Sequence, residues 1–203
     1  MSLWAIVPVK PLRRGKSRLA KVLTPDECTA LNEELLANTI NTLMSVPEIA
    51  HVLVVSRDQA ALSLARSLGA RTVQENGAPQ INVALSRATV IAKTYATQSV
   101  LVLPADLPLI TPEDILVMLS KAVDPPVVVV VPDRNKNGTN ALILSPPDLI
   151  EYQYGNNSFK KHCELALEAG ARLEICELSS LILDLDEPED LALLEKKLNI
   201  ELK

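Results

Sequence analysis

The sequence predicts an α/β fold, with a mostly parallel (mixed) central sheet and helices on both faces. Short apolar runs of strand length alternate along the chain with longer segments of helical periodicity. The runs at residues 3–9 and 127–131 are apolar or β-branched almost throughout, which is typical of strands buried on both faces. No repeat or linker divides the 203 residues, so we expect a single domain over residues 1–203.

Local signals place each element. Strands are expected at residues 3–9, 51–56, 70–74, 99–103, 127–131, 140–144, 173–178 and 181–186, with 173–178 at an edge of the sheet. Helices are expected at residues 25–44, 58–68, 80–96, 112–122, 159–169 and 188–198. Thr24 and Glu27 form a capping box, Thr111 precedes a proline at the first helical position, and Ser158 is the expected N-cap of helix 159–169.

The composition excludes several functions. The net charge is −5 and five residues are aromatic, so a nucleic-acid-binding surface is not expected. No apolar run approaches the roughly 18 residues of a membrane span, and the first residues enter a strand without a basic leader. Three scattered cysteines suit free thiols in a reducing compartment. We therefore expect a cytoplasmic protein; strand 173–178 could form a homodimer interface or be covered by the chain itself.

Asp106 is the first candidate functional residue. It follows the buried run 99–103 and stands between Pro104 and Pro108, which stiffen the turn. Open α/β sheets bind their ligands at the carboxyl ends of strands. A turn aspartate that bonds only to local backbone is the alternative, and the rest of the chain has to distinguish the two.

A basic loop leaves the end of the first strand. Residues 10–18 hold five of the twenty Lys and Arg residues, among them Lys10, Lys16 and Arg18. Such clusters are often solvated surface charges. Because this one follows a buried strand, we expect its cations to converge on phosphates.

Asp184 and Asp186 supply two further carboxylates. If residues 181–186 form a strand, the two side chains share one face. Together with Asp106 they could form an oxygen-ligand site for Mg²⁺, which favours carboxylates and substrate phosphates. Cations and a metal around a phosphate are the elements of phosphoryl or nucleotidyl transfer. The sequence contains neither a Walker loop nor a dinucleotide-binding fingerprint.

Several motifs resemble nucleotidyltransferases of the GT-A-like fold: Pro8-Val9-Lys10, Lys16-Ser17-Arg18-Leu19, Pro104-Ala105-Asp106-Leu107-Pro108 and Asp184-Leu185-Asp186-Glu187-Pro188. Two more segments, Gly138-Thr139-Asn140-Ala141-Leu142 and Tyr154-Gly155-Asn156-Asn157-Ser158-Phe159, are similar to the CofC/FbiD family. These are the 2-phospho-L-lactate or phosphoenolpyruvate guanylyltransferases of coenzyme F-420 biosynthesis.

The resemblance implies roles for individual residues. Asp106, Asp184 and Asp186 match metal-binding aspartates, and Thr139, Gly155 and Ser158 match positions that hold the acceptor. Pro8, Lys10, Lys16 and Arg18 match the nucleotide-binding strand end and loop, with Lys16 beside the triphosphate and, like Asp106, catalytic. Asn82 lies in a segment near the nucleoside, where Gln80-Ile81 replaces the family's Gly-Leu. Glu75 could accept hydrogen bonds from guanine N1–H and N2–H.

The expected activity is therefore a Mg²⁺-dependent transfer of GMP from GTP to phosphoenolpyruvate or 2-phospho-L-lactate, with release of pyrophosphate. The sequence does not separate these two acceptors or exclude 3-phospho-D-glycerate. A sugar-phosphate or molybdopterin nucleotidyltransferase of the same fold is one alternative. A nucleotide-binding regulatory domain without turnover is another.

Overall fold

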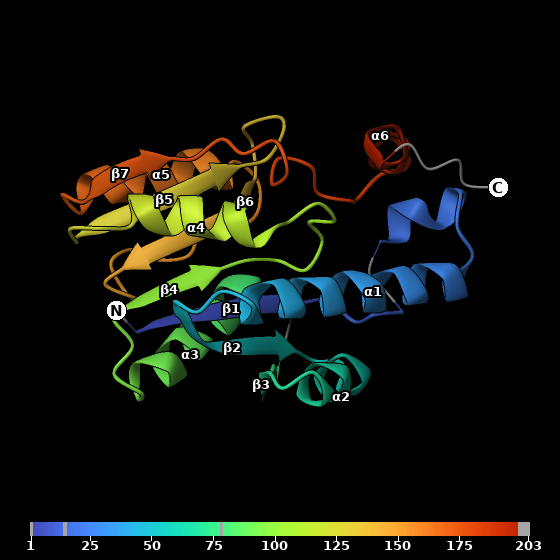
Figure 1. Ribbon diagram of the computed structural model, residues 1–203, viewed down its shortest axis with the longest axis horizontal. Coiled ribbons are helices and arrows are strands. Elements are labelled where there is room, and N and C mark those ends of the chain that lie inside the picture. Colours follow the sequence, from blue (N-terminus) through green and yellow to red (C-terminus); the bar gives the residue numbers. More distant parts are fainter. Residues whose placement is uncertain (1, 14–15, 78, 199–203) are drawn as a thin grey trace.

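In the residues that the structure describes, seven strands form a sheet in the order β3-β2-β1-β4-β6-β5-β7. The computed structural model describes residues 2–13, 16–77 and 79–198 (Figure 1). The strands are β1 (Leu3–Val9), β2 (Ile49–Ser56), β3 (Arg71–Gln74), β4 (Ser99–Val102), β5 (Val127–Pro132), β6 (Thr139–Ser145) and β7 (Arg172–Ile175). The expected edge position of the strand near residue 173 is confirmed by β7.

The sheet is mixed, as predicted. β1 pairs in parallel with β2 and β4, β2 with β3, and β5 with β7. Only β6 runs antiparallel to its neighbours β4 and β5 among the described strands. A short loop joins β5 to β6, and a connection of that length returns the chain antiparallel. The carboxyl ends of β1, β2, β3 and β4 therefore meet at one edge of the sheet.

Helices cover both faces of the sheet (Figure 1). They are α1 (Pro25–Met44), α2 (Gln59–Ser67), α3 (Ile81–Lys93), α4 (Pro112–Lys121), α5 (Ser158–Glu168) and α6 (Pro188–Leu198), with a short 3-10 helix, η1 (Ser17–Lys21). Apolar residues of α1, α2 and α4 share one core with Ala5 and Val7 of β1, whereas α3 and α5 share a second core with Trp4 and Ile6. This alternation buries β1 on both faces.

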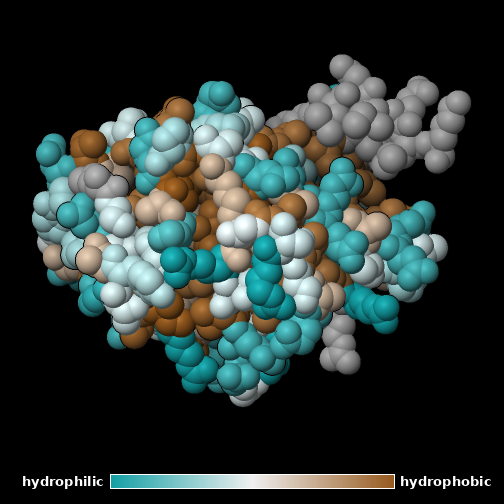
Figure 2. Space-filling model, turned by 60° about the horizontal axis from the view of Figure 1, so that its bottom comes forward, coloured by the Kyte–Doolittle hydropathy of each residue, from teal (hydrophilic) through white to brown (hydrophobic). Residues whose placement is uncertain are grey.

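The helix start signals at Thr24 and Thr111 are confirmed. Each threonine accepts a hydrogen bond from the backbone of the third helical residue, whose own carboxylate bonds back to the threonine N–H. None of the described helices has both the length and the apolar character needed to cross a membrane. Figure 2 shows the side of α2, β3 and α3, where hydrophobic residues reach the surface between hydrophilic ones.

The predicted strand at residues 181–186 is wrong. The structure describes these residues as turns and irregular chain. The N–H of Leu185 donates to the carbonyl oxygen of Asp106 at 2.9 Å, and Asn140 Nδ2 donates to the carbonyl oxygen of Leu181 at 2.8 Å. The apolar residues of this segment are buried, but the neighbouring loop and strand end satisfy its backbone instead of an adjacent strand.

Ser158 is not the N-cap of its helix. It is the first residue of α5, and Asn157 precedes it as N-cap with a positive φ of 58° and no side-chain capping bond. The loop after β5 takes over the capping: Asn137 accepts hydrogen bonds from the N–H groups of Asn157 and Phe159. Because a distant loop satisfies these donors, the helix starts without a local hydroxyl cap.

A small third core joins η1 and α1 to α6 and the segment before it. Leu19 of η1 and Leu185 are fully buried together with Cys28 and Leu35, and α6 packs Leu191 and Leu194 against them. Figure 1 shows α6 beside η1, away from the sheet. Leu19 follows the basic loop and Leu185 stands between Asp184 and Asp186. This core therefore brings the predicted cations and the predicted carboxylates to the same place.

Candidate active site

A cavity of about 490 Å³ opens at the carboxyl ends of the parallel strands. Of the residues predicted from the sequence, those that line it are Pro8, Lys10, Lys16, Glu75, Asp106, Gly155 and Asp186. They come from the ends of β1, β3 and β4, from the start of η1, from the segment before α5 and from the segment before α6. The structure thus gathers cations and carboxylates that are remote in sequence around one opening.

Lys16 lies between the two acidic segments. Its Nζ is 3.4 Å from Oδ1 of Asp186, and only 5% of its side chain is exposed. The residue adopts a positive φ of 59° at the start of η1, where its carbonyl accepts the N–H of Leu19. The backbone therefore turns at Lys16 and directs its side chain inward, next to Asp186 and within the electrostatic reach of Asp106.

Asp106 occupies an unfavourable place for a negative charge. Burial raises the pKa of its carboxyl; the Lys16 ammonium opposes this, the Asp186 carboxylate adds to it, and the Lys10 ammonium opposes it. The N–H of Leu185 bonds to the Asp106 carbonyl, which fixes this turn against the second acidic segment. The carboxyl has several charged groups around it, as a site for a charged ligand requires.

The Asp184 carboxyl interacts electrostatically with the same cluster. Burial raises the pKa of its carboxyl to about 6, and the nearby charges of Asp106, Asp186 and Asp190 contribute to the rise. Within the described residues, however, no three His, Cys, Asp or Glu side chains are close enough to form a ready metal site. The three predicted aspartates are near enough to repel one another but are not gathered at coordination distance.

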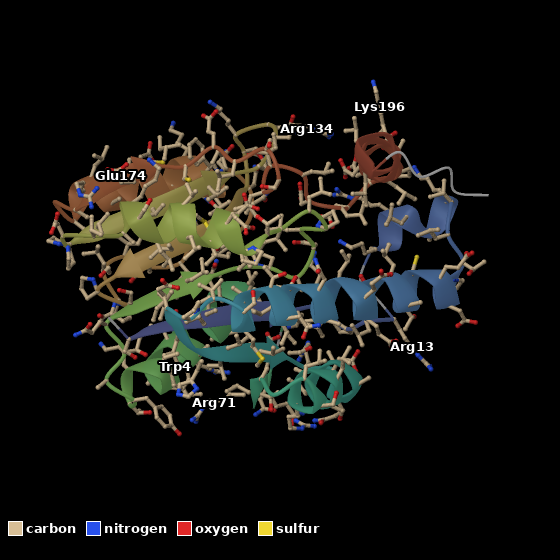
Figure 3. The ribbon with its side chains drawn as sticks, viewed as in Figure 1. Trp4, Arg13, Arg71, Arg134, Glu174 and Lys196 are labelled. Carbon is tan, nitrogen blue, oxygen red and sulfur yellow. The ribbon has the colours of Figure 1, made fainter. Side chains whose placement is uncertain are left out.

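Asp190 holds the second acidic segment in position. Its Oδ2 accepts the N–H of Asp186 at 3.1 Å and of Glu187 at 2.8 Å, at the start of α6. Its Oδ1 lies 3.2 Å from Nη2 of Arg134, which Figure 3 shows in the loop between β5 and β6. Asp190 is 5% exposed. A buried carboxylate thus ties α6 and the neighbouring loop to the backbone that carries Asp186.

Gly155 forms the wall of the cavity on the α5 side. Its φ of 121° is a conformation that residues with a side chain rarely adopt, and no atom lies within 4 Å of where a Cβ would stand. Asn82 fixes the preceding residue: its Nδ2 donates to the Tyr154 carbonyl at 3.2 Å and its Oδ1 accepts the Tyr154 N–H at 2.8 Å. Asn82 does not line the cavity but anchors its wall to the first turn of α3.

Thr139 and Ser158 lie behind this wall and are buried. The Gln153 N–H donates to Nε2 of His162, so the neutral imidazole carries its proton on Nδ1 and donates it to Oγ1 of Thr139 at 2.9 Å. Burial lowers the pKa of His162 to about 4, which keeps the ring neutral. Thr139 therefore retains its own hydroxyl proton for another acceptor.

The remaining predicted residues lie outside the cavity lining. Arg18 is exposed and pairs with Glu187 at 2.9 Å. Asp184 borders the cluster without lining the cavity. The structure adds Arg57, at the end of β2, which lines the cavity and which sequence reasoning passed over. Its position after a buried strand, like that of Lys10, is the signal that could have identified it.

Solved structures share this fold. A nucleotidyl transferase from Methanothermobacter thermautotrophicus superimposes with a TM-score of 0.70 at 15% identity, covering 97% of each chain. A 4-diphosphocytidyl-2C-methyl-D-erythritol synthase from Anaerococcus prevotii gives 0.65 at 11% identity, covering 98% of this chain and 99% of the other. At these identities the likeness shows the fold alone.

Relatives found by sequence identify the family as well as the fold. A protein named phosphoenolpyruvate guanylyltransferase from Rubrobacter xylanophilus is 42% identical over 96% of this chain and 94% of its own length. One named 2-phospho-L-lactate guanylyltransferase from Methanothermobacter thermautotrophicus is 32% identical over 94% of this chain and 83% of its own. The family model described as "Guanylyl transferase CofC like" matches residues 3–196. The chain therefore belongs to the CofC-like guanylyl transferase family.

Proposed function

We propose that the cavity binds GTP and Mg²⁺ and transfers GMP to the phosphate of phosphoenolpyruvate or 2-phospho-L-lactate, in the biosynthesis of coenzyme F-420. The observation that carries this proposal is the convergence of Lys10, Lys16, Asp106 and Asp186 on one cavity that Gly155 also lines. The cations suit phosphates, the carboxylates suit a divalent ion, and an exposed backbone at Gly155 suits an anionic acceptor.

The strand order supports an order of subsites. Across the sheet, Glu75 follows β3, Lys10 follows β1, Asp106 follows β4, and Gly155 precedes α5 on the far side. Neighbouring strands lie about 4.8 Å apart, so these residues form a row along the cavity. We place the base at the β3 end, the triphosphate over Pro8, Lys10 and Lys16, and the acceptor at Gly155.

The donor set fits Mg²⁺. Asp106, Asp184 and Asp186 offer carboxylate oxygens, and the pKa of Asp106 and that of Asp184 are raised partly because the carboxylates repel one another. A divalent cation would relieve that repulsion. When bound, Mg²⁺ would neutralise phosphate charge and orient the reacting groups. Lys16 would then be free to move from Asp186 to the phosphates.

The chemistry needs mainly positioning. An oxygen of the acceptor phosphate forms the new bond to the α-phosphorus, the bond from that phosphorus to the bridging oxygen breaks, and pyrophosphate leaves. Because the attacking phosphate is already ionised near neutral pH, no general base is required. The Lys16 ammonium stabilises the charge that develops on the transferred phosphoryl group and on pyrophosphate.

Thr139 and Ser158 support the acceptor subsite from behind Gly155. Thr139 keeps a hydroxyl proton that His162 does not take, and Ser158 begins α5 at its positive end. The N–H groups of residues 157–159 are already bonded to Asn137 and Gly155, so they are not free donors for the acceptor. We therefore assign direct anion binding to the backbone at Gly155 and a supporting place behind it to the Thr139 hydroxyl.

Pyrophosphate release tests the proposal. The purified protein would be mixed with GTP, MgCl₂ and each acceptor separately: phosphoenolpyruvate, 2-phospho-L-lactate, 3-phospho-D-glycerate and a sugar phosphate. We expect release with phosphoenolpyruvate first, because the relative at 42% identity carries that name. Release only with sugar phosphates would favour another nucleotidyltransferase of this fold, and binding of GTP without any release would favour a regulatory domain.

A further inference from the structure

Three residues form a row across β1, β2 and β3. Val9 pairs with Ser56, and Ser56 pairs with Gln74. The residues that follow these partners are Lys10, Arg57 and Glu75, so the row runs from a cation beside the proposed triphosphate to a carboxylate at the far strand. All three line the cavity.

Arg57 lacks a counter-charge. Its Nη2 donates to the carbonyl oxygen of Gly77, but its Nε is buried without a hydrogen-bond partner. No carboxylate in the described ranges forms an ion pair with it. Guanidinium has five N–H donors, and a partly buried one without an anion is costly unless a ligand supplies acceptors. The cavity is where such a ligand would lie.

The Glu75 side chain is held in place through only one of its two carboxylate oxygens. Its N–H donates to the Ser56 carbonyl at 2.8 Å, and its Oε1 accepts the N–H of Gln80 at 3.1 Å, just before α3. In the described part of the chain, its second carboxylate oxygen has no partner. Glu75 therefore presents one free acceptor to the same cavity that Arg57 lines.

We propose that Arg57 and Glu75 read the edge of the nucleotide base and select guanine over adenine. This inference rests on the proposed function for the presence of a nucleoside triphosphate in the cavity. Guanine presents the acceptors O6 and N7 next to the donors N1–H and N2–H₂. The Arg57 donors match O6 and N7. The unpartnered Glu75 oxygen matches the 2-amino group, and Oε1, which Gln80 leaves with a second lone pair, matches N1–H.

Adenine presents the wrong pattern to this pair. It has an amino donor where guanine has O6, and it lacks both N1–H and the 2-amino group. Its amino group would face the Arg57 donors, and its N1 acceptor would face the Glu75 carboxylate. Base contacts of this kind discriminate by about tenfold to hundredfold for each good pair.

Equilibrium binding of GTP, ITP and ATP, without acceptor, tests the inference. ITP keeps O6 and N1–H but lacks the 2-amino group. For Arg57→Met we expect about tenfold to hundredfold weaker binding of GTP and ITP, and ATP binding within about threefold of wild type. For Glu75→Gln, which retains the oxygen that Gln80 needs, we expect GTP to weaken more than ITP.

Arg87 offers a matched control. Its Nη1 donates to the carbonyl of Asn76 in the same loop at 3.3 Å, but it does not line the cavity. Arg87→Gln should keep the wild-type preference for GTP. If it loses that preference as Arg57→Met does, Arg57 acts by holding the loop and not by reading the base. Arg57→Lys, which keeps the charge without the planar fork, repeats the test if Arg57→Met does not fold.

Two results would overturn the inference. Equal loss of GTP and ATP binding in Arg57→Met would place Arg57 on the phosphates, and a wild-type protein that binds GTP and ATP alike would show that the base is not read. Failure of the proposed function would give a different experimental result from failure of this inference. In that case GTP would still bind selectively through Arg57 and Glu75, but no acceptor would release pyrophosphate.

Discussion

The ammonium of Lys16 lies 3.4 Å from Oδ1 of Asp186, although 170 residues separate the two in the chain. The pair is formed because Leu19 and Leu185, their near neighbours in sequence, share a buried core. Because only 5% of the Lys16 side chain is exposed, solvent screens its charge weakly. Lys16 thus occupies the electrostatic position that a metal ion between the aspartates would also favour.

We expect Lys16→Met to bind Mn²⁺ more tightly than wild type in the absence of nucleotide, by about tenfold, because a competing cation is removed. The same variant should lose at least about a hundredfold in pyrophosphate release, since the developing phosphate charge loses its partner. Titration of Mn²⁺ by electron paramagnetic resonance measures the first effect. Lys21→Met, on the exposed side of η1, is the control; unchanged Mn²⁺ affinity in Lys16→Met would refute the competition.

Asp106→Asn should abolish turnover while leaving the fold intact. The substitution removes a carboxylate whose pKa burial raises, so the charge is costly in the folded protein and its loss does not destabilise it. We expect a melting temperature equal to or above that of wild type, and pyrophosphate release below detection. Near-normal release would exclude Asp106 as a metal ligand.

Asp190→Ala should displace the acidic segment. It removes the acceptor for the N–H groups of Asp186 and Glu187 and leaves Arg134 unpaired. The cost to stability should be about 1.5–3 kcal/mol, typical of lost hydrogen bonds to a charged group. Denaturant unfolding measures this cost, and Arg134→Gln, which keeps the two hydrogen bonds to Asp190, should cost less. Equal stability of wild type and Asp190→Ala would mean that these hydrogen bonds do not hold the segment.

His162 should make the protein sensitive to acid. Its folded pKa of about 4 lies below the ordinary value of 6.5 for histidine, so between these pH values the unfolded state binds a proton that the folded state does not. Stability is therefore fully present above pH 6.5 and falls as the pH drops toward 4, by about 3 kcal/mol. Unfolding measured across this range should show a smaller slope in His162→Gln. His51→Gln, at the other histidine, serves as the comparison, and an unchanged slope in His162→Gln would show that His162 is not the group responsible.

Prediction from sequence succeeded where the signal is local. Thr24 and Thr111 predict the starts of their helices correctly, because a hydroxyl and a carboxylate within four residues form the hydrogen bonds of a capping box. β1 and β4 follow from continuous apolar runs. Asp106 could be placed at the end of β4 for the same reason, and its place in a cavity lining follows from the parallel sheet.

Prediction from sequence failed where a residue far along the chain determines the local structure. Residues 181–186 look like a strand, yet Leu185 bonds to the Asp106 carbonyl and Asn140 to the Leu181 carbonyl. Ser158 looks like an N-cap, yet Asn137 supplies the acceptors for the start of α5. Arg57 has no motif around it, and its role is visible only in register with Val9 and Gln74.

The amino-acid sequence alone determined the alternation of strands and helices, the class of the sheet and the residue types of the site. These depend on periodicity and on capping within a few residues, which operate over one turn or one strand. The tertiary structure alone decided which charges meet. Lys16 reaches Asp186, and Arg57 stands beside Glu75, because packed cores and strand register bring distant backbone segments within a few ångströms of each other.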